Sequence, residues 1–600
     1  MGANHVKQDP TVEQKIARLT EGMDFRTASF FRAQLSRRSV LGGITGLTGL
    51  GVFGNGAASP ASSSTRRTSA QDAAPPEEQV FRGVANPEIA IALDIYERVY
   101  ERTGIADVFS QSLVFFTKDF DIVEGGATEW SSDESGKVWT FKLRDDLMWS
   151  DGNKVTAADY VKTFQYAADP EHAWDFAWFW DGDILNFSEC LAGEVPLEEL
   201  GVRQGANEFE LVFETVNPSP YLPAKLLYSP TLSKAALETH GPLYNSNPET
   251  CVSSGPFILT EWVRDQYLTF ERNEAYSGPW EVPLQKIIQK FAAPAQSFTL
   301  YEADEIDYME GPAPAELQLM QADPETASQI YQGVGDFACL YFFFDVTMAP
   351  FDNKLVRQAF SHVIDRDAMK EQIWGPQANA APSFLAPGFP GSNTEELAGI
   401  QAFDPELGKQ LLAEAGYPDG EGFPELVMTV RGGGTPIEVA TTQAYGTMLK
   451  NHLNIDVELQ TMDRNAFYAD MKTIQFGWVS YGMDFFDPSN MLSVWKTGGR
   501  HPWSNEEYDR LYDEASNFLG DPEERINMFK EVERILVEDV PAVFTYFQTP
   551  IQLIKPYVGG PALEPDVNGI AAWHWPGFFG GANPNVRELY ITADAPTGRQ

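Results

Sequence analysis

The chain has 600 residues, of which 43% are hydrophobic and 22% charged, a composition that provides for several globular domains with large cores. Its 86 acidic residues outnumber the 43 basic ones and give a formal net charge of −43, so nucleic acid phosphates would repel it. Solubility is the plainest explanation of this acidity. Adaptation to salt and a preference for cationic ligands are the alternatives.

The N-terminal region carries a paired arginine, Arg37-Arg38, in "SRRSVL". The uncharged stretch "GGITGLTGLGVFGNGAAS" that follows is too short and too weakly apolar for a membrane-spanning helix. This order of features is typical of a twin-arginine export signal. The alternative is that the Arg-Arg pair occurs by chance before a linker. The sequence predicts an export region at 1–65 and a flexible linker at 66–78. The body of the protein is expected on the periplasmic or extracytoplasmic face of the membrane.

Three cysteines are present, at positions 190, 251 and 339. Their spacings match no metal-binding motif. Cys339 lies in the apolar run "FACLYFFF" and is expected to be a buried thiol. Cys190 and Cys251 could form one disulfide in an oxidising compartment, or remain free.

Strand and helix patterns alternate along the body. The run "VWTFKL" (138–143) alternates as a half-buried strand does, and Thr156 with Asp159 forms a capping-box pattern at the start of a helix. Residues 253–278 predict a β-hairpin around the polar turn "RDQ". A helical apolar stripe follows within "PFDNKLVRQAFSHVIDRDAM".

Further along, Asp404, Pro405 and Gly416 mark the start and end of another helix. A strand at 425–430, a helix at 436–452 and a strand at 455–459 form a βαβ unit, which indicates a parallel sheet. The expected fold class is mixed α/β (α+β) with more than one lobe.

Catalytic and metal-binding signatures are missing from the sequence. No two of the seven histidines stand three or four residues apart, and HExxH, GxSxG and Walker A motifs do not occur. The Gly-rich "RGGGTP" (431–436) matches neither phosphate-binding fingerprint and is interpreted as a strand-to-helix loop. We therefore expect no enzyme activity, no catalytic residue, no metal and no cofactor.

Several segments, taken in order, resemble one family. The first two are "FKLRDDLMWSDGNKVTAADYV" and "GPFILTEWVRDQYLTFERNEAY"; the others are "ADEIDY", "PFDNKLVRQAFSHVIDRDAM", "GKQLLAEAGYPDG" and "VPAVFTYFQTPIQLIKPYVGG". Together they cover residues 130–560 in part. They are similar to the extracytoplasmic solute-binding proteins of ABC importers in the oligopeptide, dipeptide and nickel class (bacterial extracellular solute-binding protein family 5).

The resemblance implies a two-lobed periplasmic-binding-protein fold that is type II-like and closes about a hinge, with an extra subdomain in the first lobe. The first lobe would comprise 79–290 plus 545–600, and the second 291–544. Crossings between the lobes are expected at 290–296 and 544–550.

The resemblance also implies a ligand site at "YGMDFFDPSN" (481–490). Peptide-binding members carry a "D-(Y/F)-x-(D/E/N)-P" stretch whose first Asp pairs with the peptide ammonium, and "DFFDP" places this role on Asp484. Tyr481, Gly482 and Met483 would offer backbone groups to an extended peptide, as an added strand does. Phe485 and Trp478 complete the expected lining.

Two alternatives stay open. Asp484 could cap a helix or accept local backbone N–H groups. The ligand could also be an oligosaccharide stacked on Trp178, Trp180 or Trp478, as some members of this class bind sugars. In either case, the resemblance implies a membrane permease with its ATPase as partners, no nucleic acid, and a monomer.

Overall fold

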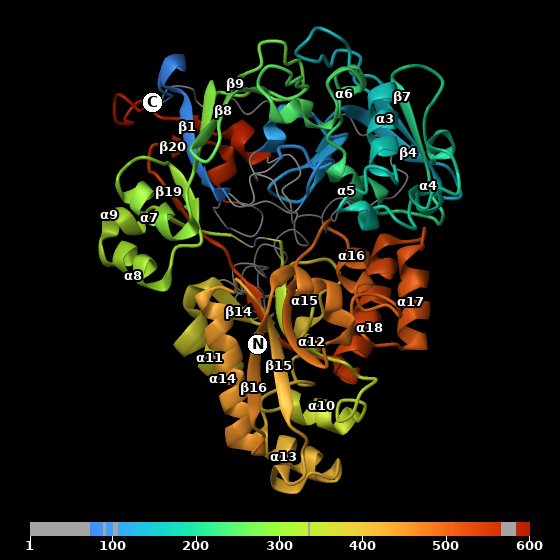
Figure 1. The fold of residues 1–600 in the computed structure, drawn as a ribbon, viewed down its shortest axis with the longest axis vertical. Coiled ribbons are helices and arrows are strands. Elements are labelled where there is room, and N and C mark those ends of the chain that lie inside the picture. The colour runs from blue at the N-terminus through green and yellow to red at the C-terminus, as the bar shows by residue number, and fades with distance from the viewer. Residues whose placement is uncertain (1–72, 88–91, 100–105, 334–335, 566–583, 600) are drawn as a thin grey trace, which may run out of the picture.

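The computed structural model describes residues 73–87, 92–99, 106–333, 336–565 and 584–599. The expected export region 1–65, and the linker as far as residue 72, lie outside the described residues. Within the described ranges, no helix combines the length and apolarity needed to cross a bilayer. Figure 1 shows two lobes, one above the other, with several chain crossings between them.

The first lobe is built on a four-stranded sheet in the order β1-β10-β9-β8. The predicted hairpin is confirmed, since β8 and β9 pair antiparallel, and the parallel pair β1 and β10 brings the start of the described chain beside residue 290. A cluster of apolar side chains on this sheet also receives residues from the C-terminal segment, including Leu589 and Ile591. The strands are Val80–Ala85 (β1), Phe257–Val263 (β8), Tyr267–Arg272 (β9) and Lys286–Phe291 (β10), with the short pair Val558–Gly559 (β20) and Tyr590–Ile591 (β21).

An extra subdomain of the first lobe contains a second four-stranded sheet, in the order β4-β5-β7-β6. The predicted strand at 138–143 is β5, and Thr156 N–H donates to the Asp159 carboxylate at 2.9 Å, as the capping-box pattern predicts for α3. The strands are Val114–Phe116 (β2), Ile122–Glu124 (β3), Ala127–Ser132 (β4), Val138–Leu143 (β5), Val202–Gln204 (β6) and Glu210–Glu214 (β7). The helices are Ala157–Ala167 (α3), Phe187–Leu191 (α4), Leu222–Lys225 (α5) and Lys234–His240 (α6).

A small three-stranded sheet, β11-β19-β12, lies beside the first lobe together with three helices (Figure 1). Its strands are Tyr308–Glu310 (β11), Ile330–Gln332 (β12) and Ile551–Ile554 (β19). Its helices are Pro294–Glu302 (α7), Pro314–Ala322 (α8) and Pro324–Ala327 (α9). Residues 294–332 were expected to open the second lobe at 291. The structure corrects this boundary, because the segment pairs with β19 and packs on β1, so the chain leaves the first lobe only after β12.

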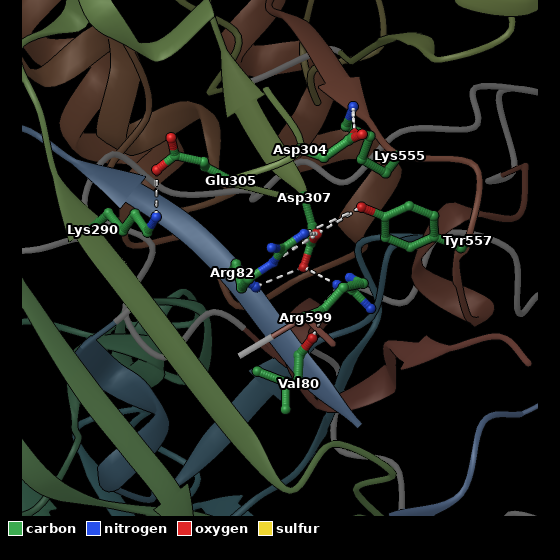
Figure 2. A network of polar contacts seen from close by, with 9 residues as sticks. All are labelled: Val80, Arg82, Lys290, Asp304, Glu305, Asp307, Lys555, Tyr557 and Arg599. Carbon is green, nitrogen blue, oxygen red and sulfur yellow. Dashed lines mark hydrogen bonds and ion pairs between the residues drawn. The ribbon is translucent and has the colours of Figure 1, made fainter. Parts of the chain in front are cut away.

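A buried ion cluster attaches this small sheet to the first lobe (Figure 2). The Asp307 carboxylate, which has no exposed surface, accepts from Arg82 Nη2 at 2.7 Å, from the Tyr557 hydroxyl at 3.0 Å and from Arg599 near the C-terminus. A buried carboxylate requires such partners to offset the loss of its hydration. Asp307, the residue before β11, thus joins the small sheet to β1 and to the C-terminal segment, and this long-range pairing determines where residues 294–332 belong.

The second lobe is organised around a six-stranded mixed sheet in the order β14-β18-β13-β17-β15-β16. The predicted βαβ unit is confirmed, with β15 and β16 parallel and α14 between them. Strand β13 reads "CLYFFF" because both of its faces are covered: Leu340 and Phe342 pack into one hydrophobic cluster, and Cys339 and Tyr341 into another on the opposite side. The strands are Cys339–Phe344 (β13), Ala378–Ala380 (β14), Leu426–Arg431 (β15), Val457–Met462 (β16), Phe476–Tyr481 (β17) and Ala542–Gln548 (β18).

The helices of the second lobe begin at side-chain caps that the sequence shows. Asp404 Oδ1 accepts the N–H of Leu407 at 3.0 Å at the start of α13. The helices are Lys354–Ser361 (α10), Arg366–Met369 (α11), Thr394–Leu397 (α12), Pro405–Glu414 (α13), Pro436–Leu453 (α14), Arg464–Asp470 (α15), Pro488–Ser493 (α16), Glu506–Ser516 (α17) and Pro522–Asp539 (α18).

The three cysteines are buried free thiols. Cys190 packs in the core of the extra subdomain, whereas Cys251 packs on the first-lobe sheet. The structure therefore contains no Cys190–Cys251 disulfide.

Candidate ligand-binding site

The expected site residues lie on β17 and in the turn that follows it, and successive side chains of the strand point to opposite faces of the sheet. Trp478 is only 2% exposed, with its ring 4.5 Å from that of Phe342 and 6.0 Å from that of Tyr546. Tyr481 lies on the other face, beside the cluster that includes Met483. The structure therefore places Trp478 in the core of the second lobe and does not bring it together with Asp484.

Asp484 is almost completely buried, with 2% of its surface exposed. Its Oδ2 accepts from the Tyr481 hydroxyl at 2.7 Å and from Asn490 Nδ2 at 2.9 Å, and its backbone N–H donates to Asn490 Oδ1 at 2.7 Å. The Asp484 side chain caps no helix, because the N-cap of α16 is Asp487. Its hydrogen-bond partners are two neutral side chains, which orient the carboxylate without neutralising it.

Burial raises the pKa of Asp484 above its ordinary value. The hydrogen bonds from Asn490 and Tyr481 oppose this rise, and so do the positive charges of Lys225 and Arg500. Neither cation pairs directly with the carboxylate: in the part of the chain that the structure describes, no basic nitrogen lies within 4 Å of it. Asp484 is thus a buried anion that lacks a contacting counter-ion.

A second carboxylate, that of Asp336, lies against the same turn. A methyl group at Gly482 would lie 2.0 Å from one of its oxygens, so any larger residue there would displace the Asp336 carboxylate. The N–H of Met483 donates to the Asp336 carbonyl at 2.8 Å and is therefore already engaged. Burial, with the nearby charge of Asp484, raises the pKa of Asp336 to about 6. Sequence patterns gave no signal for Asp336, because it comes from the crossing segment before β13.

Phe485 and Phe486 reach from the second lobe to the first. The Phe485 ring is stacked on Tyr221 at 5.7 Å and lies 6.0 Å from Phe179, while Phe486 is stacked on Phe120 at 4.6 Å. The turn that carries Asp484 is therefore part of the contact between the lobes. Met483, in contrast, is fully buried inside the second lobe.

Asp487 forms a buried ion pair that sequence analysis did not foresee. Its carboxylate accepts from Arg525 Nη1 at 2.7 Å and from Nη2 at 2.9 Å, and also from the Ser489 N–H at 3.0 Å. Both side chains are at most 3% exposed. This bidentate pair fixes the start of α16, and with it Asn490, which orients Asp484.

Lys225 and Arg500 are the two cations whose charges oppose the rise in the pKa of Asp484, and they come from different lobes. Lys225 ends α5 and pairs with Asp183, whereas Arg500 Nη1 donates to the Ser480 carbonyl at 3.1 Å. Lys225 is distant from Asp484 in sequence, and Arg500 lies beyond α16, outside the Asp484 turn. No spacing pattern could therefore have identified either cation.

The tryptophans considered for sugar stacking are dispersed. Trp180 and Trp478 are buried in the cores of different lobes, and Trp178 is 49% exposed. A surface hollow of about 510 Å³ in the first lobe lies away from the Asp484 turn. It is lined by His240, Leu243, Tyr244, Ser246, Asn247, Pro248, Thr250, Trp262 and Arg264. Among the described residues, no three His, Cys, Asp or Glu side chains gather as a metal site requires.

Comparisons with known proteins agree with this architecture. The family model "Bacterial extracellular solute-binding proteins, family 5 Middle" matches residues 121–502. The dipeptide-binding protein DppE of Bacillus subtilis is 27% identical over 471 residues, which cover 76% of this chain and 84% of DppE. The periplasmic oligopeptide-binding protein OppA of Salmonella typhimurium is 27% identical over 457 residues, covering 73% and 81% of the two chains.

Among solved structures, the murein tripeptide-binding protein MppA of Escherichia coli, in its unliganded open form, is similar at a TM-score of 0.67 and 25% identity. The match covers 87% of this chain and 99% of MppA. The matched region extends over more than half of the chain and includes parts of both lobes and the Asp484 turn. The chain belongs to the bacterial extracellular solute-binding proteins of family 5.

Proposed function

We propose that this protein is the substrate-binding component of an ABC importer and captures peptides between its lobes. Asp484 would pair with the peptide's α-ammonium. The observation that carries this proposal is the state of Asp484: a carboxylate that is 2% exposed, oriented by Tyr481 and Asn490, and located where the two lobes meet. An arriving ammonium would supply the counter-charge that these neutral partners do not.

The relatives support the choice of ligand. DppE, OppA and MppA are named for binding dipeptides, oligopeptides and a murein tripeptide, respectively. A binding role without catalysis fits these relatives as well. The buried positions of Trp180 and Trp478 give no support to the oligosaccharide alternative, since neither ring presents a face for a sugar.

Calorimetry on the full chain tests the role of Asp484. The change Asp484→Asn preserves size and hydrogen bonding but removes the charge, so a bound ammonium would remain buried without compensation. Affinity for free peptides should fall by roughly 2 kcal/mol, about thirtyfold. The matched control is Asp456→Asn, whose carboxylate is 84% exposed on the same lobe and should leave binding unchanged.

Peptides acetylated at the amino terminus provide the complementary ligand series. They should bind the wild type poorly, and Asp484→Asn should hardly affect them. If free and acetylated peptides bind alike and the variant equals the wild type, Asp484 has a structural role only. If no peptide binds and an oligosaccharide does, the proposed ligand class is wrong.

We further propose that the protein is exported by the twin-arginine route and works as a monomer with a membrane permease and its ATPase. The support is the Arg37-Arg38 pair before a weakly apolar stretch, together with the periplasmic location in the names of OppA and MppA. Changing both arginines to lysine should retain the precursor inside the cell, as fractionation would show. Normal export of this variant would contradict the proposed route.

A further inference from the structure

The surface hollow of about 510 Å³ belongs to the first lobe alone, because all of its lining residues fall between positions 240 and 264. It is formed where the end of α6 and the segment 242–250 meet the end of β8, elements that Figure 1 shows in the upper lobe. Small-molecule sites in proteins typically enclose about 300–1,000 Å³. The hollow therefore has the size of a ligand site, and it shares no residue with the Asp484 turn.

The lining of this hollow differs in charge from the protein as a whole. None of its nine residues is acidic, although 86 of the 600 residues of the chain are Asp or Glu. Its basic side chains are His240, the last residue of α6, and Arg264, the residue after β8. On a protein with a net charge of −43, this is a place where an anion can approach a cation without facing a lining carboxylate.

The guanidinium of Arg264 is held in place but not neutralised. Its central carbon lies 3.5 Å from the ring centroid of Trp262, and Nη2 donates to the Ser246 carbonyl at 3.3 Å. Within the described ranges, no carboxylate lies within 4 Å of it, not even that of the neighbouring Asp265. A guanidinium has five N–H donors, so the others remain for the two oxygens of a carboxylate or phosphate.

The hollow also offers apolar surface. Leu243 is 53% exposed, and it lines the same hollow as the partly exposed Trp262. A single exposed leucine is ordinary on a protein surface, but here it accompanies an aromatic ring and an unneutralised cation in one concavity. This combination suits a ligand that has both a negative group and an apolar body.

We propose that the hollow is a second ligand site, which binds a small organic anion with its carboxylate or phosphate on Arg264 and its apolar body against Leu243 and Trp262. This site is independent of peptide capture between the lobes, because no residue of the second lobe lines it.

A purely structural role for Arg264 accounts for less of this arrangement. An arginine that only solvates the surface would be expected to pair with one of the abundant carboxylates, as Arg203 pairs with Glu214 at 2.9 Å on the same lobe. An arginine that only covers Trp262 has no need of a concavity free of acidic side chains.

Calorimetry on the full chain tests the proposal with phenylacetate, phenyl phosphate and the neutral analogue phenylacetamide. At least one anion should bind the wild type tenfold or more tightly than phenylacetamide, and the tighter of the two identifies the favoured anionic group. Arg264→Gln, at an exposed position, should abolish this preference. The matched control Arg203→Gln, whose side chain is 55% exposed on the same lobe, should keep it.

The apolar part of the site is tested separately. Leu243→Ser should weaken phenylacetate and phenylacetamide alike by severalfold, and so leave the difference between them unchanged. Leu185→Ser, a change of a 37% exposed leucine elsewhere on the first lobe, is its control and should have no effect. Asp484→Asn should not alter the binding of either anion.

Three results would overturn the proposal. The first is that neither anion binds more tightly than phenylacetamide, and the second is that Arg264→Gln retains the full preference. The third is that Asp484→Asn changes the affinity for the anions, which would place these probes between the lobes. None of these results bears on peptide capture, which free and acetylated peptides test on their own.

Discussion

The ammonium of Lys225, on the first lobe, lies 5.6 Å from the ring centroid of Phe485, on the second. The same ammonium is 4.3 Å from the ring centroid of Phe179 and pairs with Asp183. First-lobe residues alone supply that ion pair and the Phe179 ring, and the approach of the second lobe adds the Phe485 ring. The aromatic enclosure of Lys225 is therefore complete only when the lobes are together, and it stabilises the contact between them.

The first prediction follows from this contact. Phe485→Leu keeps an apolar side chain but removes the ring, and a cation–ring contact contributes about 0.5–2 kcal/mol depending on its desolvation. The unliganded variant should therefore open more often and show a larger radius of gyration by small-angle scattering than the unliganded wild type. Phe403→Leu, a change of an exposed ring on the second lobe, is the control. Identical scattering from Phe485→Leu and wild type would refute a role in closure.

The second prediction concerns the buried pair of Asp487 and Arg525. Arg525→Met leaves the Asp487 carboxylate buried and without its cation, which should lower the free energy of unfolding by about 3–5 kcal/mol. Arg510→Met removes an exposed pair with Glu507 and should lower it by less than about 1 kcal/mol. Urea unfolding followed by circular dichroism measures both. Equal effects of the two changes would mean that burial of the Asp487 pair has no energetic consequence.

Local structure was predictable from the sequence because its causes are local. The strand at 138–143, the capping of α3 by Thr156 and Asp159, and the βαβ unit of β15, α14 and β16 all follow from spacing within a few residues. The family resemblance supplied the two lobes and directed attention to Asp484, which proved to be a buried carboxylate.

The lobe boundary and the surroundings of the candidate site depend on contacts between segments that are distant in sequence. Arg82 and Asp307 are 225 positions apart, yet their ion pair assigns residues 294–332 to the first lobe. Trp478 looked like a lining residue because it is aromatic and close to Asp484 in sequence, but the two-residue period of β17 turns it to the opposite face. Charge partners such as Arg525 and Lys225 become visible only once the elements are packed.

The third prediction uses Glu533 on α18, which is fully buried and accepts the N–H groups of Phe384, Leu385 and Asn393. Burial raises its pKa to about 7 from 4.5. Because the pKa is higher in the folded chain, Glu533 loses its proton at a lower pH in the unfolded chain than in the folded one. Its contribution to stability is therefore complete below pH 4.5 and declines as the pH rises to 7. The stability of the wild type relative to Glu533→Gln should therefore fall by about 3 kcal/mol over this interval.

Urea unfolding at several pH values measures this difference. Glu531→Gln, on the same helix with its side chain 54% exposed, is the control. A constant difference between wild type and Glu533→Gln from pH 4.5 to pH 7 would mean that Glu533 titrates alike in the folded and unfolded chains.

The fourth prediction concerns the net charge of −43. Repulsion among surface carboxylates opposes the compact state. It extends over about 30 Å at 0.01 M salt but over only about 3 Å at 1 M, where salt screens it. The midpoint of thermal unfolding should therefore rise by several degrees when sodium chloride increases from 0.01 M to 1 M. Sucrose at matched water activity is the control for non-ionic effects, and a midpoint insensitive to salt would rule out repulsion as a significant term.

The last prediction concerns Asp336, whose carboxylate lies against Gly482 and near Asp484 and whose pKa is raised to about 6. Above that pH it is negative and adds to the attraction of Asp484 for a ligand ammonium; below it, the group is protonated and that attraction is lost. Affinity for a free peptide should therefore fall roughly three- to tenfold between pH 7 and pH 5, a change of about 0.7–1.4 kcal/mol. Asp336→Asn should bind more weakly at pH 7 and show a flatter dependence of affinity on pH, because asparagine does not titrate.

Calorimetry at fixed ionic strength provides the measurement, and Asp470→Asn, at an exposed position of α15, is the control. A pH dependence that is equally steep in Asp336→Asn and in the wild type would assign the titration to another group and remove Asp336 from the site.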